Sequence, residues 1–161
     1  MQQMQVAGHA PCIADTMQTY VYGHVMQRLK TYIVEDSPVI RDSLIAALEE
    51  MTPMDVVGVA EDEASAVQWL TESGTTVDLV IVDIFLKRGS GLGVLQLVDR
   101  TEHPRSIIVL SNHATPEMRR RCKELGATRV FDKSNELDAL MLYCERLASG
   151  EAGNSQRGEL R

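Results

Sequence analysis

The chain has 161 residues, of which 44% are hydrophobic and only 4% aromatic, and it carries a formal net charge of −7. This length suits one domain with an aliphatic core and a short surplus of residues. The acidic balance argues against direct binding to nucleic acid, and the sequence contains neither an apolar run of membrane-spanning length nor a secretory signal peptide.

The first 29 residues differ in composition from the rest of the chain. They are rich in Gln and Met, carry few charges and show no clear hydrophobic period, although residues 17–29 are compatible with a weak helix. We expect residues 1–29 to be a flexible or weakly helical N-terminal extension. This extension is either a regulatory segment or the consequence of an upstream start, with Met26 as a well-placed alternative initiator.

Five short apolar segments are predicted to be β-strands, because they are rich in β-branched residues and end at charged or polar side chains. The central segments are continuously apolar, which is typical of strands that are buried on both faces of a sheet. The predicted strands cover residues 31–36, 54–60, 78–83, 106–111 and 129–132.

Helical patterns follow each of these segments. Ser37 and Thr115 each precede a proline, so that an N-cap and a first helical residue stand together, and Asp62 can cap the second helix. The glycine-rich stretch after Asp83 leads into a third helix over residues 92–100. The expected inward stripes are Ile40, Leu44, Ala47, Leu48 and Met51 in the first helix, Met118, Cys122 and Leu125 in the fourth, and Leu137, Leu140, Met141, Cys144 and Leu147 in the last.

Strict alternation of strand and helix predicts a doubly wound α/β fold, a five-stranded parallel sheet with (βα)5 alternation, over residues 30–148. Residues 149–161 lack core-building side chains and are expected to be a disordered tail. The cysteines (Cys12, Cys122 and Cys144) share no metal-ligand spacing, so we expect reduced thiols in a cytoplasmic protein.

Chemically active side chains stand at the carboxyl ends of the predicted strands, where such sheets bind their ligands. Glu35 and Asp36 end the first strand, Asp83 the third and Ser111 the fourth, while Lys133 follows the fifth. Three carboxylates that converge at one edge repel one another and favour a bound cation. Oxygen ligands and room for a phosphoryl group make Mg2+ the expected ion.

Four segments of the sequence resemble the receiver domain of the response regulators of bacterial two-component phosphorelay signalling. The resemblance covers residues 30–148 and implies the flavodoxin-like receiver fold of chemotaxis-regulator-like proteins. It also implies a regulatory phosphoacceptor, rather than an enzyme, that assists its own phosphorylation and dephosphorylation. The segments are YIVEDSPVIRDSL, DLVIVDIFLKRGSGLGVL, IIVLSNHATPEMRRRCKELGA and RVFDKS.

The resemblance assigns a metal set and a phosphoacceptor. Asp83 takes the place of the phosphorylated aspartate, a nucleophile that receives a phosphoryl group from a partner's phosphohistidine. Asp36 and Asp83 would bind Mg2+ directly, Glu35 would act nearby through water, and the backbone carbonyl of Phe85 would complete the protein ligands.

The remaining family positions concern switching. Lys133 would pair with Asp83 and then with the phosphoryl oxygens, and Ser111 would move to hydrogen-bond the phosphoryl group. The family's usual aromatic switch residue is Val130 here, so the signal has to pass through backbone and Ser111 shifts. Phe85 offers no acid or amide to orient a water molecule, which predicts slow intrinsic loss of phosphate.

Two rival functions, nucleotide binding and phosphatase activity, do not agree with the residues present. The spacing of Gly89, Gly91 and Gly93 misses the dinucleotide-binding pattern, and the acids after the first strand would repel a nucleotide phosphate. We therefore expect these glycines to serve turn formation. A haloacid-dehalogenase-type phosphatase needs a second acid two residues after its nucleophile, where Phe85 stands. A pseudo-receiver that binds partners without being phosphorylated remains the alternative.

The output of the protein is expected to be interaction rather than catalysis. The residues after Ala148 suffice for no further domain, so we expect a stand-alone receiver that is phosphorylated by a sensor histidine kinase or a histidine phosphotransfer protein. A homodimer through the fourth helix, fifth strand and fifth helix is a further expectation, without direct contact to nucleic acid or membrane. The basic run over residues 119–123 is interpreted as a solvated helix face, with a partner-binding surface as the rival interpretation.

Overall fold

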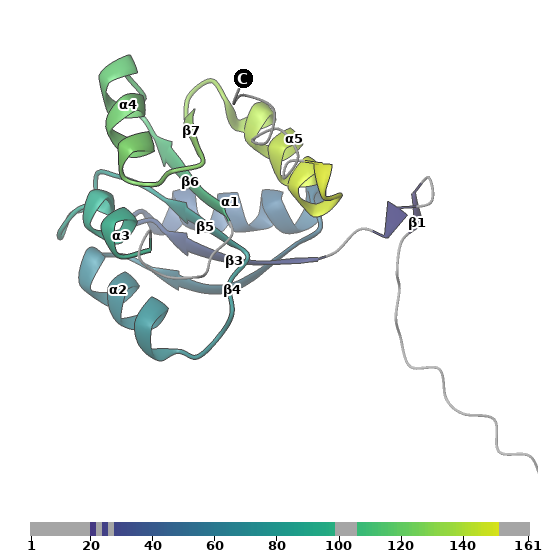
Figure 1. Ribbon diagram of the computed structural model, residues 1–161, viewed down its shortest axis with the longest axis horizontal. Coiled ribbons are helices and arrows are strands. Elements are labelled where there is room, and N and C mark those ends of the chain that lie inside the picture. The colour runs from purple at the N-terminus through teal and green to yellow at the C-terminus, as the bar shows by residue number, and fades with distance from the viewer. Residues whose placement is uncertain (1–19, 22–23, 26–27, 99–105, 152–161) are drawn as a thin grey trace, which may run out of the picture.

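The computed structural model describes residues 20–21, 24–25, 28–98 and 106–151 (Figure 1). Strands and helices alternate from β3 to α5, as the sequence pattern predicts. The elements are β3 (Leu29–Val34), α1 (Pro38–Met51), β4 (Met54–Ala60), α2 (Glu63–Glu72), β5 (Leu79–Val82), α3 (Gly91–Val98), β6 (Ser106–Ser111), α4 (Pro116–Glu124), β7 (Arg129–Asp132) and α5 (Leu137–Ala148).

Two very short strands precede this domain. β1 (Tyr20–Val21) pairs antiparallel with β2 (His24–Val25), so the weak helix expected over residues 17–29 is not found at the described residues of that stretch. The first long strand, β3, begins at Leu29, two residues before the expected Thr31. The rest of the predicted extension, Cys12 and most of the predicted tail lie outside the described residues.

The five long strands form one parallel sheet in the order β4-β3-β5-β6-β7. The chain runs outward from β3 to the edge strand β4, then crosses back to β5 and continues to the other edge at β7. The order of strands therefore reverses between β3 and β5. This reversal confirms the doubly wound fold and marks the position at which such sheets bind ligands.

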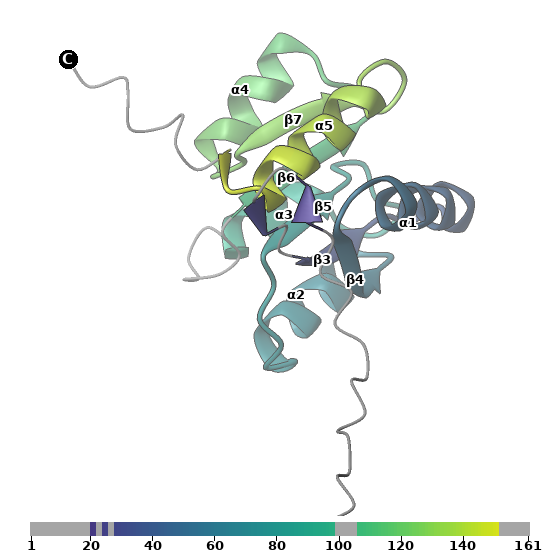
Figure 2. The ribbon, with the colours of Figure 1, turned by 90° about the vertical axis from the view of Figure 1, so that its right-hand side faces the viewer.

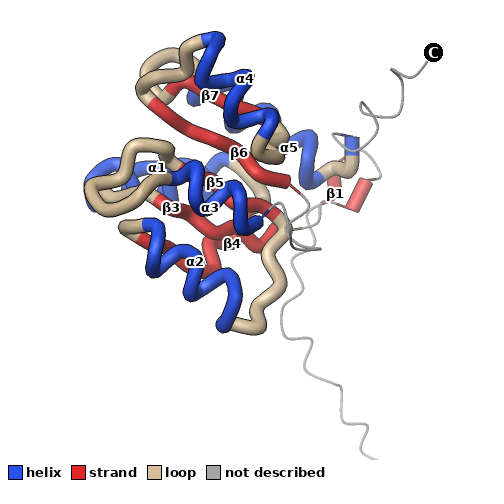
Figure 3. Tube along the Cα trace, turned by 60° about the vertical axis from the view of Figure 1, so that its left-hand side comes forward, coloured by secondary structure: helices blue, strands red, loops and turns tan. Residues whose placement is uncertain are grey.

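Helices cover both faces of the sheet. Viewed from one side, α1 and α5 lie in front of the strands (Figure 2), and viewed from the other, α2, α3 and α4 do (Figure 3). Each layer has its own cluster of buried side chains. Leu44 and Leu140 belong to the cluster under α1 and α5, whereas Ala66, Val94 and Cys122 belong to the cluster under the other three helices.

The predicted helix starts are found where the capping residues stand. The side chains of Ser37, Asp62 and Thr115 accept hydrogen bonds from the third backbone N–H after them. These caps satisfy donors that the first helical turn leaves free. Because each start follows the end of a strand directly, the caps also hold the chain close to the carboxyl edge of the sheet.

Three residues of the predicted inward stripes are exposed to solvent. Ile40 is 39% exposed, Met51 58% and Leu137 44%, while Leu44 and Leu48 in α1 are buried as expected. The reason is geometric, because a helix on a sheet buries a stripe narrower than the sequence pattern in α1 suggests. Ile40 and Leu137 instead line a groove between α1 and α5.

The cysteines in the described part of the chain behave as core residues. Cys122 and Cys144 are free thiols and both are buried. Burial raises the pKa of the Cys144 thiol to about 12, which keeps it protonated and unreactive. None of the helices in the described ranges combines the length and apolar content that a bilayer span requires.

Candidate functional site

The register of the sheet brings the predicted site residues to one edge. Val34 pairs with Val82, so Glu35 and Asp83 leave adjacent strands at the same level. Ser111 is level with Asp132 across β6 and β7, which places Lys133 just beyond Ser111. Adjacent parallel strands thus gather residues that are far apart in the sequence.

Lys133, which follows β7, bonds to the acids that follow β3 and β5. Its Nζ donates to Asp83 Oδ2 over 2.7 Å and to Glu35 Oε2 over 2.5 Å. The three side chains are 8%, 9% and 4% exposed for Lys133, Asp83 and Glu35, respectively. Water therefore screens these two ion pairs far less than it would on an open surface.

The protonation of Lys133 is set by a balance of burial and pairing. Burial alone lowers the pKa of an ammonium group. The hydrogen bonds to Asp83 and Glu35, together with the attraction of their charges, outweigh burial and raise the pKa of Lys133 above its usual value. The lysine is therefore a fixed positive charge at neutral pH.

Three carboxylates form the acidic cluster that the sequence predicted. One oxygen from each of Glu35, Asp36 and Asp83 lies within 4.8 Å of the others. Backbone N–H groups hold them in place, since Asp83 Oδ1 accepts from Phe85 (3.1 Å) and Asp36 Oδ2 from Lys87 (2.9 Å). The orientation of the acids is thus coupled to the loop that follows β5.

This donor set suits a hard divalent cation. Lys133 compensates one of the three carboxylate charges, which leaves two negative charges in a half-enclosed space. Carboxylate oxygens at this spacing, with a loop backbone beside them, are the ligands that Mg2+ prefers. The residues present therefore fit the ion that the sequence predicts.

Ser111 reaches the same edge but does not bond to Asp83. Its side chain is fully buried, and its Oγ accepts a hydrogen bond from the backbone N–H of His113 over 3.2 Å. The ring of His113 meets the ring of Phe85 edge to face, with 5.0 Å between their centroids. The loops after β5 and β6 therefore contact each other through these two rings.

Arg119 is a structural residue, although the basic run over residues 119–123 predicts a solvated helix face. Its guanidinium donates to Ala114 O (2.9 Å), to Val130 O (2.6 Å) and to Glu136 Oε2 (2.7 Å). One side chain of α4 thereby links the loop after Ser111, strand β7 and the residue that precedes α5. Nothing in a basic run distinguishes such an arginine from its exposed neighbours.

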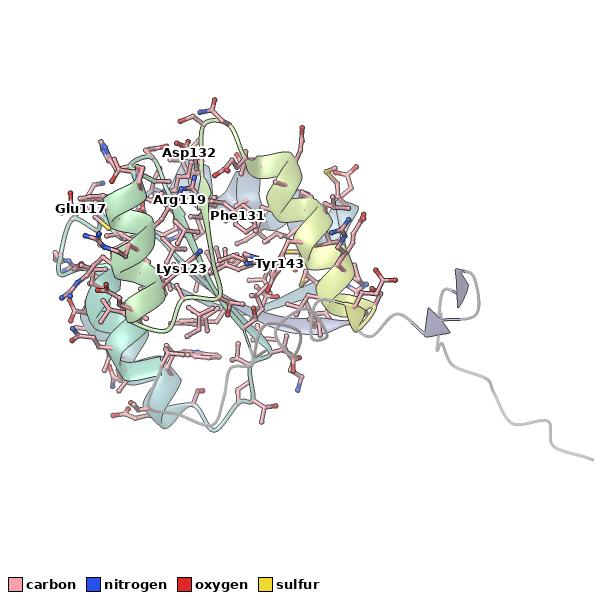
Figure 4. The ribbon with its side chains drawn as sticks, turned by 45° about the horizontal axis from the view of Figure 1, so that its top comes forward. Glu117, Arg119, Lys123, Phe131, Asp132 and Tyr143 are labelled. Atoms are coloured by element: carbon pink, nitrogen blue, oxygen red, sulfur yellow. The ribbon has the colours of Figure 1, made fainter. Side chains whose placement is uncertain are left out.

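Glu136 completes this link. Its Oε2 also accepts the backbone N–H of Asp132 over 2.6 Å, and the bonds from Arg119 and Asp132 lower the pKa of this carboxyl group. Figure 4 shows Arg119 between α4 and β7, with Phe131 on the side of β7 that faces Tyr143 and α5. Val130 belongs to one core cluster and Phe131 to the other, which confirms that they face opposite ways.

An apolar groove adjoins the acidic edge. It has a volume of about 330 Å³ and is lined by α1 and α5. Val39, Ile40 and Leu137 expose apolar surface in it, 76%, 39% and 44% respectively. Lys133 and Asn112 also line it, and Lys133 bonds to Asp83 and Glu35, so the groove adjoins the acidic cluster.

The sequence matches a known family over most of its length. The family described as response regulator receiver domain matches residues 31–145. A sensory transduction protein LytR of Staphylococcus haemolyticus is 33% identical over 112 residues, which are 70% of this chain and 42% of that protein. A protein-glutamate methylesterase/protein-glutamine glutaminase of Geobacter sulfurreducens is 28% identical over 108 residues, 67% of this chain and 28% of that protein. The matched part of this chain thus spans less than half of either relative.

Solved structures share the fold at low sequence identity. The response regulator domain of Thermotoga maritima CheB has a TM-score of 0.66 and 21% identity, and the alignment covers 77% of this chain and 98% of that one. The non-phosphorylated receiver domain of RcsB from Escherichia coli has a TM-score of 0.67 and 21% identity, with 78% and 96% covered.

Proposed function

This chain belongs to the response regulator receiver domain family, and from that premise we propose that Asp83 is a phosphoacceptor in two-component signalling. The observation that carries the proposal is the contact of Asp83 with Lys133 beside Glu35 and Asp36, at the reversal of strand order. An Asp83 oxygen attacks the phosphorus of a phosphohistidine, a P–O bond forms as the P–N bond breaks, and the histidine leaves as neutral imidazole after taking up a proton.

Charge neutralisation is the main demand of this transfer. Asp36, Asp83 and the Phe85 carbonyl would hold Mg2+, with Glu35 behind them, and the ion would offset the negative charge of the phosphoryl oxygens. Lys133 contributes a second positive charge, which its raised pKa secures. As the phosphoryl group arrives, Lys133 exchanges its contact with Asp83 for one with a phosphoryl oxygen.

The switch begins at Ser111. Among the described hydrogen bonds, the Ser111 hydroxyl takes part in one, which it accepts from the N–H of His113. It can therefore turn toward a phosphoryl group on the neighbouring strand. Such a shift pulls on Ala114, whose carbonyl accepts from Arg119. We propose that Arg119, rather than an aromatic ring at Val130, carries the signal to the face formed by α4, β7 and α5.

The groove between α1 and α5 is the proposed docking site of the phosphodonor. A sensor histidine kinase or a histidine phosphotransfer protein has to bring an imidazole close to Asp83, and Lys133, which bonds to Asp83, lines the groove. Exposed Val39 and Ile40 suit the apolar side of a helix that carries the histidine. The face of α4, β7 and α5 remains the proposed surface for a homodimer or a target protein, in the cytoplasm.

Phosphotransfer is tested by incubating the protein with acetyl phosphate and MgCl2 and measuring its intact mass. The wild type is expected to gain the mass of one phosphoryl group, and the gain is expected to disappear in Asp83→Asn and without Mg2+. Asp42→Asn, which removes an exposed acid of α1, serves as the matched control. Equal gain in Asp83→Asn, or none in the wild type, would leave a binding module that is not phosphorylated.

A further inference from the structure

Glu63, the first residue of α2, holds the glycine-rich loop that follows Asp83. Its Oε2 accepts the backbone N–H of Ser90 over 2.7 Å, and its own N–H donates to Arg88 O over 3.3 Å. Asp62 beside it pairs with Arg88 over 2.7 Å. The first residues of α2 and its cap thus bind the loop at both Arg88 and Ser90.

Gly89 in the loop and Gly93 in α3 make room for the Glu63 side chain. A Cβ atom on Gly93 would lie 2.0 Å from Glu63 Oε1, and one on Gly89 would lie 2.4 Å from Glu63 Cβ. Of Gly89, Gly91 and Gly93, only Gly89 has a positive φ, 78°. The turn role expected from the sequence therefore applies to Gly89, whereas Gly93 is small because Glu63 occupies the adjacent space.

Gly91 serves a different close approach. A Cβ atom there would lie 2.1 Å from the backbone oxygen of Asp83, and the Gly91 N–H donates to Ile84 O over 3.0 Å. The loop therefore folds back directly onto the residue that carries the proposed chemistry. A side chain at Gly91, the first residue of α3, would therefore clash with the backbone of Asp83.

The same loop presents its backbone to the acidic cluster. Phe85 N–H bonds to Asp83 and Lys87 N–H bonds to Asp36, so the loop is fixed on the site side by two carboxylates. A divalent cation would draw on both of these acids. The contact between Glu63 and Ser90 involves neither of these acids, so a bound cation would leave it in place.

We infer that Glu63 is a positioning residue for the cation site, which holds the loop so that the Phe85 carbonyl and the Asp36 carboxylate stay in place when a metal binds. The inference rests on the proposed function, since it assigns Glu63 to the same site. Glu63 touches neither the proposed metal ligands nor the phosphoryl group, and it acts only through the loop. Partners of this kind typically tune metal affinity by about tenfold or more.

The first test is the binding of Mg2+ by titration calorimetry on the full chain. Glu63→Ala is expected to weaken binding by about tenfold, with faster hydrogen exchange at the Ser90 and Lys87 amides. Glu63→Gln keeps an oxygen that can accept from Ser90, so it is expected to restore most of the affinity. Glu72→Ala, which removes a carboxylate from the other end of α2, is expected to bind Mg2+ like the wild type.

The second test uses Gly93, whose added methyl group would meet Glu63 before any other side chain. Gly93→Ala alone is expected to weaken Mg2+ binding to the same degree as Glu63→Ala, because it displaces the carboxylate. In the Glu63→Ala background the same change is expected to cause no further loss. This non-additivity separates a specific contact from a general weakening of the fold.

Three results would overturn the inference in distinguishable ways. Unchanged Mg2+ affinity in Glu63→Ala, with normal phosphorylation of the wild type at Asp83, overturns the role of Glu63 and leaves the proposed function standing. Additive losses in the double variant overturn the direct contact. A wild type that neither binds Mg2+ nor gains phosphoryl mass removes the proposed function, and the inference with it.

Discussion

The loops that follow β5 and β6 leave neighbouring strands at the same edge, yet they are held in opposite ways. The loop after β5 gives its backbone N–H groups to side-chain carboxylates, one of which belongs to the proposed phosphoacceptor itself. Each of these bonds is 3.1 Å or shorter, and together they fix the loop at three positions. The pairs are Phe85 with Asp83, Lys87 with Asp36 and Ser90 with Glu63.

The loop after β6 is held by a cation instead. The carbonyl of Ala114 accepts a hydrogen bond from the Arg119 guanidinium, which also donates to Val130 O in β7 and to Glu136 before α5. The Arg119 side chain is 33% exposed, so water can replace its bonds at moderate cost. In the mechanism that we propose, the first loop stays in place during phosphoryl transfer and the second transmits a displacement.

Removal of Lys133 tests whether the first loop and its acids form one unit. Lys133→Met leaves Glu35 and Asp83 buried without their partner, and loss of a buried ion-pair partner costs about 3 kcal/mol. We expect that loss in urea unfolding and roughly a 100-fold slower phosphorylation by acetyl phosphate. Lys123→Met, at an exposed position of α4, is the control, and a phosphorylation rate equal to wild type in Lys133→Met would contradict the role.

Removal of Arg119 tests whether this side chain transmits a displacement of the second loop to α4. Arg119→Ala breaks three hydrogen bonds at a partly exposed site, for which we expect a loss of about 1–2 kcal/mol in the free energy of unfolding. Phosphorylation at Asp83 is expected to proceed, while hydrogen exchange in α4 no longer responds to it. Arg120→Ala removes only an exposed pair with Glu124 and should change stability by less than about 0.5 kcal/mol. An intact exchange response in Arg119→Ala would remove this route.

The rings of Phe85 and His113 join the two loops, and substitution of Phe85 tests how long the phosphoryl group stays on Asp83. Phe85 is 52% exposed and contacts His113, so neither an acid nor an amide at this position directs water to the phosphorus. We expect a slow loss of phosphate, which Phe85→Glu accelerates on the order of tenfold by orienting a water molecule. Phe85→Leu is the matched apolar control, and wild-type phosphate that is lost within seconds would contradict the expectation.

The comparison also explains which features the sequence could predict. Strand ends are local, because an apolar run that stops at Asp83 or Ser111 fixes where the side chain lies once alternation predicts a parallel sheet. Contacts such as those of Arg119 and Glu63 depend on how far one side chain reaches across other elements. Their residue types are ordinary for exposed helical positions, so no periodicity reveals them. The excess width predicted for the α1 stripe, including Met51, has the same origin, since only the packed fold decides which side chains are covered.

Acid pH should weaken the link between Arg119 and Glu136 that holds the second loop. Arg119, and then the Asp132 N–H, hold the pKa of Glu136 below its ordinary value of 4.5, so the carboxylate stabilises the fold above that value and loses its contribution as the pH falls through the lowered pKa. The side chain is 36% exposed, and solvent screening limits this contribution to less than about 1 kcal/mol. Urea unfolding is expected to show Glu136→Gln slightly less stable than the wild type at neutral pH, and equal to it once the pH has fallen below the lowered pKa of Glu136. A difference that persists in acid would mean that Glu136 stabilises the fold by packing rather than through its negative charge.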